Sequence, residues 1–229
     1  MGAHGRYLVG NFDNGKFEPE QEAISLQYGN SAYAAQSFSN LPNGRIVRMA
    51  WDRWHLPAHG FRGQMGIPTE MSLSRLENTY YLEARPVEEL KTLYNHTRFF
   101  ENVRVSDDTP FCIPLEDAPY VCQINGLTDA GSKAEIQIFG RTIQLNFQRN
   151  EVTIGNNSAP ISITGKRCDI TILVDRCSIE LFADGGKIYM SCLDDSTLCD
   201  RNLPYLVLKA DRDTSLESME IHALNSIWR

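Results

Sequence analysis

The stretch Asp169-Ile-Thr-Ile-Leu-Val-Asp-Arg-Cys-Ser-Ile-Glu-Leu-Phe-Ala-Asp-Gly-Gly-Lys-Ile-Tyr-Met-Ser-Cys192 decides the fold. Apolar residues alternate with other residues in three short runs, at 170–174, 179–181 and 188–190. A period of two residues is typical of β-strands. Asp184-Gly185-Gly186 supplies residues that tolerate a positive φ, as a hairpin turn between twisted strands requires. The stretch therefore predicts two or three antiparallel strands joined by tight turns.

The same alternation extends over the second half of the chain. It recurs at 135–139, 142–147, 151–154, 205–208 and 219–224, with turn residues between the runs. Many short strands at regular spacing, without intervening helices, indicate a sandwich or barrel. We therefore expect an all-β fold in which residues 95–229 form an antiparallel β-sandwich.

The first part of the chain also predicts strands, followed by a single helix. Residues 1–85 contain short strand candidates separated by turns such as Asp13-Asn14-Gly15. In Pro86–Tyr94, a proline stands at a plausible first helical position, and Val87, Leu90 and Tyr94 recur at spacings of three and four. The expected organisation is strands over 1–85, a linker helix over 86–94 and the sandwich over 95–229.

Composition excludes several classes of function. The 229 residues carry a formal net charge of −7 and a sequence pI of about 5.3. Nucleic-acid binders concentrate Lys and Arg, so we expect no nucleic-acid partner. No apolar stretch is long enough for a transmembrane helix, and the first residues lack the layout of a signal peptide. We therefore expect no membrane association and a cytoplasmic location.

The cysteines and histidines predict neither a metal site nor a cofactor. None of the six cysteines forms a Cys-x-x-Cys pair, and several fall in or beside strands, where a thiol behaves as a small hydrophobe. Without a secretion signal, reduced cysteines are expected. His55 and His59 are four residues apart, but the residues around them are typical of a loop rather than of a zinc site.

Several segments, in the right order, resemble the β-fructosidases of glycoside hydrolase family 32 (invertases, levanases and inulinases). The resemblance is carried by residues 7–17, 28–36, 45–54, 61–73, 85–91 and 169–192. It implies that residues 1–85 correspond to the end of the last blade of a β-propeller and that residues 95–229 correspond to the β-sandwich that follows it. The implied substrates of the family are sucrose and fructans.

The motifs that carry the chemistry of that family do not occur in these 229 residues. The family is retaining, so it needs two carboxyl groups about 5 Å apart. The resemblance implies a nucleophile in a Trp-x-Asn-Asp-Pro segment, a transition-state stabiliser in Arg-Asp-Pro and an acid/base in Glu-Cys, and the sequence contains none of these. We therefore assign no catalytic residue, expect the chain to begin within the last blade, and predict that it is inactive alone.

Four residues are weak candidates for binding a sugar: Tyr33, Gln36, Trp51 and Trp54. An aromatic ring beside polar groups suits a sugar, whose C–H face stacks while its hydroxyls form hydrogen bonds. The alternative is that these aromatics pack within the blade. Gln27 and Ser31 stand where the family usually has aspartates, which weakens the expectation that this segment orders a fructosyl ring.

The remaining carboxylates predict no catalytic pair. The acids of the Glu18–Glu22 segment and the adjacent pairs Asp107-Asp108 and Asp194-Asp195 are expected to be solvated. Glu70 and Glu180 match family positions with a structural role. Because Glu180 alternates with Ile179 and Leu181, we expect it to point outward from the sandwich.

Three functions remain open at this point. The chain is a non-catalytic fragment with a structural, association or glycan-contact role, or a component of an active β-fructofuranosidase whose blades lie elsewhere, or a stand-alone carbohydrate-binding module. Most aromatics of the sandwich are expected to face its core, which disfavours the third: Tyr120, Phe139, Phe147, Phe182, Tyr189, Tyr205 and Trp228. Residues 1–85 are expected to pack on the sandwich or to form a homodimer contact, because a partial blade exposes sheet edges.

Overall fold

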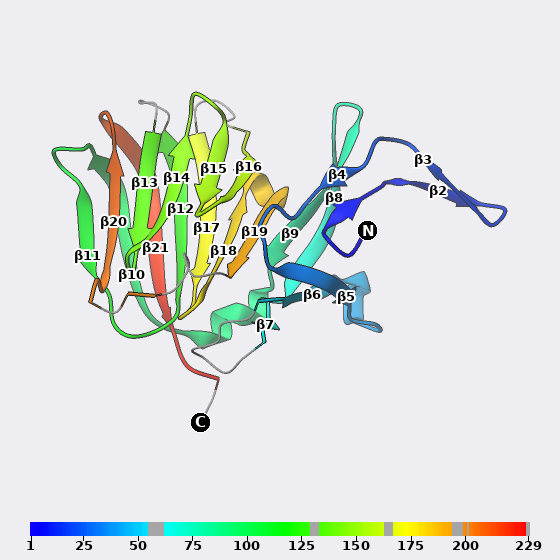
Figure 1. Cartoon of the computed structure of the whole chain (residues 1–229), viewed down its shortest axis with the longest axis horizontal. Coiled ribbons are helices and arrows are strands. Elements are labelled where there is room, and N and C mark those ends of the chain that lie inside the picture. Colours follow the sequence, from blue (N-terminus) through cyan, green and yellow to red (C-terminus); the bar gives the residue numbers. More distant parts are fainter. Residues whose placement is uncertain (55–61, 129–132, 163–166, 194–198, 201, 228–229) are drawn as a thin grey trace.

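The computed structural model describes residues 1–54, 62–128, 133–162, 167–193, 199–200 and 202–227. Figure 1 shows a two-layered antiparallel β-sandwich with a smaller group of N-terminal strands beside it. The fold class is therefore the all-β architecture that the sequence predicts. Some sequence predictions fall outside the described residues: the His55/His59 pair, Asp194-Asp195 and Trp228.

One sheet of the sandwich has six strands in the order β10-β21-β12-β17-β18-β19. Their bounds are β10 Tyr94–Val105, β21 Thr214–Leu224, β12 Tyr120–Thr128, β17 Arg167–Val174, β18 Ser178–Ala183 and β19 Ile188–Leu193. Each pair of neighbours is antiparallel. The sequence stretch 169–192 thus forms three consecutive strands of this sheet, as predicted.

The second sheet also has six strands, in the order β11-β20-β13-β14-β15-β16. Their bounds are β11 Phe111–Pro114, β20 Tyr205–Ala210, β13 Lys133–Ile138, β14 Arg141–Asn146, β15 Glu151–Ile154 and β16 Asn157–Pro160. Alternate side chains of the two sheets form one apolar core. Cys122 and Cys168 belong to this core, and burial raises the pKa of both thiols to about 12.

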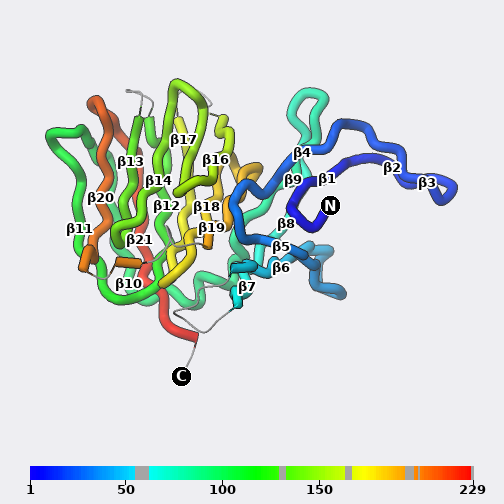
Figure 2. Tube along the Cα trace, in the orientation of Figure 1, coloured from blue at the N-terminus to red at the C-terminus, as the bar shows by residue number. Residues whose placement is uncertain are grey.

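The N-terminal part contains a five-stranded sheet and two small strand pairs. In the sheet, β5 Ala32–Ser37, β6 Ile46–Asp52, β8 Thr69–Leu76 and β9 Thr79–Pro86 lie in that order, and β7 Gln64–Met65 pairs with β6. The pairs are β1 Arg6–Tyr7 with β4 Ile24–Ser25, and β2 Gly10–Asp13 with β3 Lys16–Pro19. The β2–β3 hairpin projects away from the rest of the molecule, as Figure 2 shows.

Among the described residues, short 3-10 helices accompany the strands: η1 Pro42–Gly44, η3 Glu88–Leu93 and η4 Asp184–Gly186. η3 joins the N-terminal sheet to the sandwich. It is shorter and more tightly wound than the predicted helix over 86–94, because Pro86 still belongs to β9 and pairs with Thr69. None of the described helices is long and apolar enough to cross a membrane.

The N-terminal sheet packs against β18 and β19 through a second, smaller apolar cluster. Tyr7, Leu26 and Ala84 of the N-terminal part are buried there with Phe182 and Tyr189 of the sandwich. Two glycines permit the close approach: a Cβ on Gly186 would lie 2.6 Å from the Ala84 carbonyl oxygen, and one on Gly29 would overlap the Ser191 carbonyl. Gly186 also has a φ of +97°, as expected for the predicted turn.

Candidate functional site

Strand β6 separates two groups of functional side chains, because successive residues of a strand point to opposite faces. Trp51 is 38% exposed, whereas its neighbour Asp52 is 0% exposed. In β5, Tyr33 lies opposite Trp51 and Ala32 lies opposite Asp52, and both β5 residues are half-buried. At this end of the strand pair, one face therefore reaches solvent at Trp51, and the other is closed by the sandwich at Asp52.

The open face carries an aromatic surface, defined by His4, Tyr33, Trp51 and Arg53. The rings of Tyr33 and Trp51 meet edge to face at 6.4 Å between centroids, and His4 lies 5.0 Å from Tyr33. The Arg53 guanidinium stands 4.5 Å from the Tyr33 ring, within cation–π distance. The surface thus combines exposed ring area with nearby hydrogen-bond donors.

The structure brings two of the four sugar-binding candidates together. Tyr33 and Trp51 belong to the aromatic surface. Gln36 is exposed but lies beyond a β-bulge, opposite Met49. Trp54 is 36% exposed, follows the end of β6 and makes no ring contact with another described aromatic residue. Trp51 and Trp54 thus keep more than a third of their surface exposed, whereas Tyr33 is half-buried.

The closed face carries a buried polar cluster, which we call the junction cluster: Ser31, Arg48 and Asp52 from the N-terminal part, with Glu180, Tyr189 and Ser191 from the sandwich. Asp52 Oδ1 accepts hydrogen bonds from Ser191 Oγ at 2.6 Å and from Ser31 Oγ at 3.3 Å. Glu180 accepts from the Tyr189 hydroxyl at 2.6 Å and from the Ile67 N–H at 2.9 Å. The cluster ties the two parts of the molecule together.

Burial dominates the electrostatics of the junction cluster. Desolvation raises the pKa of Asp52 to about 6 and that of Glu180 to about 7, and each carboxylate disfavours ionisation of the other. Burial also raises the pKa of Tyr189 well above its ordinary value and lowers that of Arg48. The Arg48 guanidinium lies 5.4 Å from the centre of the Tyr189 ring.

Glu180 points away from the sandwich core, as its alternation with Ile179 and Leu181 predicts. The N-terminal part covers it, with the Ile67 N–H donating to its carboxylate, and leaves it 4% exposed. Glu70, by contrast, is half-buried and pairs with Arg45 at 2.8 Å, consistent with a structural role. Of the sandwich aromatics expected to face its core, Tyr120, Phe139 and Phe147 do so. The expectation is wrong for Phe182 and Tyr189, which are buried against the N-terminal part, and for Tyr205, which is exposed.

Two models of one protein family match this chain. The glycosyl hydrolases family 32 N-terminal domain matches residues 2–86, and the glycosyl hydrolases family 32 C-terminal model matches residues 132–193. The chain belongs to glycoside hydrolase family 32. The family resemblance drawn from the sequence segments is thereby confirmed.

Individual members of family 32 resemble the chain over most of its length. A levanase of Bacillus sp. (strain L7) is 24% identical across 100% of the chain, which corresponds to 28% of the levanase. A sucrose-6-phosphate hydrolase of Zymomonas mobilis is 28% identical over 77% of the chain and 38% of that hydrolase. The exo-inulinase structure from Aspergillus awamori shares the fold, with a TM-score of 0.80 at 17% identity over 99% of this chain and 52% of the inulinase. The chain spans well under half the length of the two curated relatives.

The family-32 segments help to explain what Gln27 and Ser31 do here. Both stand where the family usually has aspartates, and both are buried at the junction. Gln27 Oε1 accepts hydrogen bonds from the Gly29 and Ser191 N–H groups, and Ser31 Oγ contacts Ser191 Oγ at 2.8 Å. In this family-32 chain these two positions hold the N-terminal segment against β19.

Sequence reasoning did not bring the junction cluster together. Asp52 and Ser191 lie within segments 45–54 and 169–192, which carry the family resemblance, but neither residue was assigned a role. A usable signal did exist: the outward-facing positions of β18 and β19 include Phe182 and Tyr189, which are too apolar for a solvated face. Strands that are apolar on both faces indicate that a second element covers them.

Proposed function

We propose that this chain is the non-catalytic part of a β-fructosidase-type protein, in which the sandwich supports the N-terminal sheet and the aromatic surface contacts a fructosyl glycan. The observation that carries the proposal is the edge-to-face contact of half-buried Tyr33 with exposed Trp51, backed by a buried cluster on the opposite face of the same strands. A rigid aromatic pair flanked by Arg53 and His4 offers stacking area and hydrogen-bond donors, which sugar recognition requires.

The two buried carboxyls support the non-catalytic assignment. Asp52 and Glu180 both have a raised pKa, as the acid of a glycosidase does. However, hydrolysis requires carboxyls that flank a glycosidic bond, with access for substrate and water. Asp52 and Glu180 are 0% and 4% exposed and are engaged by Ser191 and Tyr189. Their arrangement suits a role in holding the two parts together.

Binding and hydrolysis test the proposal together. Purified chain should release no fructose from sucrose, levan or inulin above a mock preparation. Levan should nevertheless quench its tryptophan fluorescence, and Trp51→Ala should weaken that binding by about tenfold. Phe99→Ala is the matched control, since Phe99 is an exposed aromatic on the sandwich strand β10. Fructose release by the chain alone would overturn the non-catalytic assignment, and quenching unaffected by Trp51→Ala would exclude the aromatic surface.

A second candidate function is that of one component of an active β-fructofuranosidase. It is favoured by the fact that the chain spans only part of the length of its relatives. Because 28% to 38% of two family-32 hydrolases is matched, a protein that supplies the remaining propeller would complete an active β-fructofuranosidase. This alternative predicts fructose release after the chain is refolded with the N-terminal portion of the Bacillus levanase, and none from either part alone. Continued inactivity of a stable, purified mixture would contradict it.

A further inference from the structure

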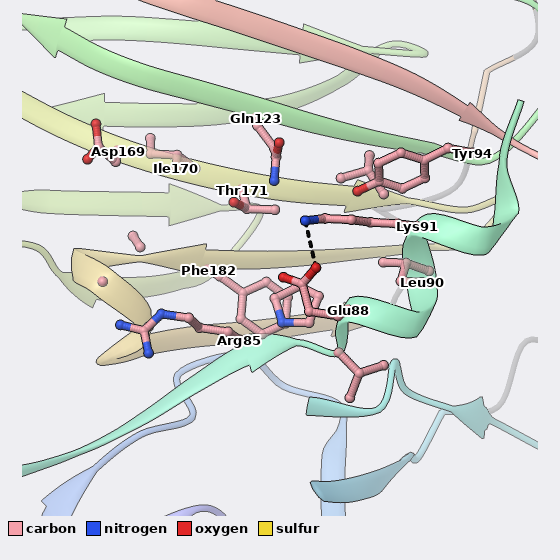
Figure 3. A pocket seen from close by; sticks show the side chains of 16 residues that line it. Arg85, Glu88, Leu90, Lys91, Tyr94, Gln123, Asp169, Ile170, Thr171 and Phe182 are labelled. Atoms are coloured by element: carbon pink, nitrogen blue, oxygen red, sulfur yellow. Dashed lines mark ion pairs between the residues drawn. The ribbon is translucent and has the colours of Figure 1, made fainter. Parts of the chain in front are cut away.

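A cleft of about 220 Å³ opens where the linker crosses the outer face of the first sandwich sheet. Figure 3 shows Gln123, Thr171, Lys91 and Tyr94 around it, with Phe182 and Arg85 on the side of the N-terminal sheet. The aromatic surface contributes none of its lining residues. The cleft is smaller than sites for drug-sized ligands, which measure about 300–1,000 Å³, so it is suited to a single ring.

Two polar side chains in the cleft lack partners among the described residues. Gln123 and Thr171 lie directly opposite each other in the β12–β17 register, which places their side chains side by side on one face. Neither the Gln123 amide nor the Thr171 hydroxyl makes a hydrogen bond to a described residue. Together they offer donors and acceptors to anything that enters the cleft.

In two other glutamine–threonine pairs of the sandwich, the glutamine amide is engaged by a neighbouring side chain. Gln137 lies opposite Thr142, and Gln144 lies opposite Thr153, both in the second sheet. The amides of Gln137 and Gln144 donate to Glu135, at 2.6 Å and 3.5 Å. Only the pair in the cleft has an amide that no described side chain satisfies.

The cationic side chains around the cleft are already paired. Lys91 pairs with Glu88 at 2.7 Å, and Arg85 pairs with Glu83 at 2.7 Å. Asp169 adds a carboxylate, whose Oδ1 accepts a hydrogen bond from the Gly126 N–H at 2.7 Å. An anionic ligand would have to displace a carboxylate from Lys91 or Arg85 and would lie near Asp169, so the cleft favours a neutral ligand over an anion.

We propose that this cleft binds one neutral sugar ring, at a site separate from the aromatic surface. The ring places its hydroxyl groups against the Gln123 amide and the Thr171 hydroxyl, and its C–H groups against the apolar side chains of Val121 and Phe182. The amide and the hydroxyl each both donate and accept, which matches the alternating capacity of sugar hydroxyls. The choice of fructosyl probes rests on the proposed function. The site itself is inferred from the lining residues of the cleft alone.

Amide chemical shifts of the full chain, titrated with fructose and with sucrose, test the assignment. Saturable shifts are expected at Thr171, Ala183 and Gly186, which line the cleft. Gln123→Leu/Thr171→Val should weaken this binding by about tenfold or more, because it removes both polar groups and keeps their approximate volume. Gln144→Leu/Thr153→Val is the matched control and should bind as the parent does. If the double variant fails to fold, Thr171→Val alone provides the test.

The outcomes separate this inference from the proposed function. Trp51→Ala should leave the shifts at Thr171 and Gly186 unchanged. Shifts that vanish with Trp51→Ala, or that persist in Gln123→Leu/Thr171→Val, would overturn the cleft while leaving the aromatic surface in place. Tighter binding of inorganic phosphate than of fructose would overturn the assignment of a neutral ligand. Fructose release by the chain would overturn the non-catalytic assignment without bearing on the cleft.

Discussion

The interior of the sandwich and the junction with the N-terminal sheet are built in different ways. The sandwich core is continuous and apolar, with side chains such as Ile136, Leu181 and Leu208 at 0% exposure. The junction combines a small apolar cluster around Leu26 with the polar junction cluster around Asp52 and Glu180. Apolar burial needs little directional precision, whereas buried polar groups stabilise only when every partner is in place.

The sandwich and the N-terminal part also differ in how much apolar surface they expose. Most of the exposed large hydrophobic side chains lie in residues 1–76, including Phe12 and Phe17, which face each other on the projecting β2–β3 hairpin. A two-stranded hairpin has little stability of its own in water. We therefore expect the sandwich to be the more stable part and the N-terminal sheet to depend on the junction.

The largest effects are expected from truncating one fully buried leucine in the sandwich core and one at the junction. Leu208→Ala in the sandwich core should lower the free energy of unfolding of the whole chain by about 2–5 kcal/mol, the usual cost of a fully buried leucine. Leu26→Ala, equally buried at the junction, should mainly release the N-terminal sheet. Denaturant unfolding followed by hydrogen exchange in both parts distinguishes the two. Equal loss of protection throughout the chain in Leu26→Ala would show that the molecule unfolds as one unit.

A rise in pH should weaken the junction. Asp52 and Glu180 have a folded pKa above the ordinary values of 3.8 and 4.5, so the folded junction favours their protonated forms. That contribution is complete below the ordinary values and is lost as pH rises through about 6 to 7. Proteolysis of residues 1–86 should therefore become faster from pH 4 toward pH 8. The protease should cleave unfolded chain, and its cleavage rate should be corrected for the pH dependence of the protease itself.

Asp52→Asn provides the control for the pH dependence. It removes one of the two titrating groups and keeps the side-chain size, so the rise in cleavage should become shallower. Hydrogen exchange in β13 and β14, corrected for its intrinsic pH dependence, should not follow this transition. A junction whose protection increases over the same pH range would contradict the direction of the pKa shifts.

The architecture followed from sequence because the strands of the sandwich alternate cleanly. The runs at 135–138, 142–145 and 151–154 bury every second residue, as their pattern predicts. The boundary between strand β9 and helix η3 at Pro86 could not be predicted from the sequence, because it depends on the tertiary pairing of Pro86 with Thr69. Local preference alone extends the helix to that proline.

The site was only partly predictable for the same physical reason. Tyr33 and Trp51 are recognisable as aromatics on neighbouring strands, but their exposure depends on which face the sandwich covers. Glu180 shows the limit most clearly. Its outward direction follows from alternation with Ile179 and Leu181, whereas its burial requires knowing that Ile67, between β7 and β8, donates to it. Sequence periodicity gives the direction of a side chain and not what lies opposite.

Removing one hydroxyl should test the polar half of the junction. Tyr189→Phe leaves Glu180 Oε2 without the hydrogen bond at 2.6 Å and should cost about 1–3 kcal/mol of docking stability. Tyr120→Phe is the matched control, since the Tyr120 hydroxyl accepts from the Glu116 N–H within the sandwich. Limited proteolysis of residues 1–86 should speed up in Tyr189→Phe only. Equal acceleration in both variants would show that neither hydroxyl acts on the junction specifically.

The smallest effect is expected at the ion pairs that connect the N-terminal sheet to the linker. Arg45 pairs with Glu70 at 2.8 Å and with Glu89 at 2.6 Å, which holds the pKa of Glu89 down at about 2. Because the Glu89 carboxylate is largely exposed, water and salt compete with the interaction. Arg45→Gln should therefore change thermal stability by less than Tyr189→Phe does, and the difference from the parent should shrink further in 1 M salt, where screening acts within about 3 Å. A larger loss than in Tyr189→Phe would mean that the linker contacts, and not the buried cluster, hold the N-terminal sheet in place.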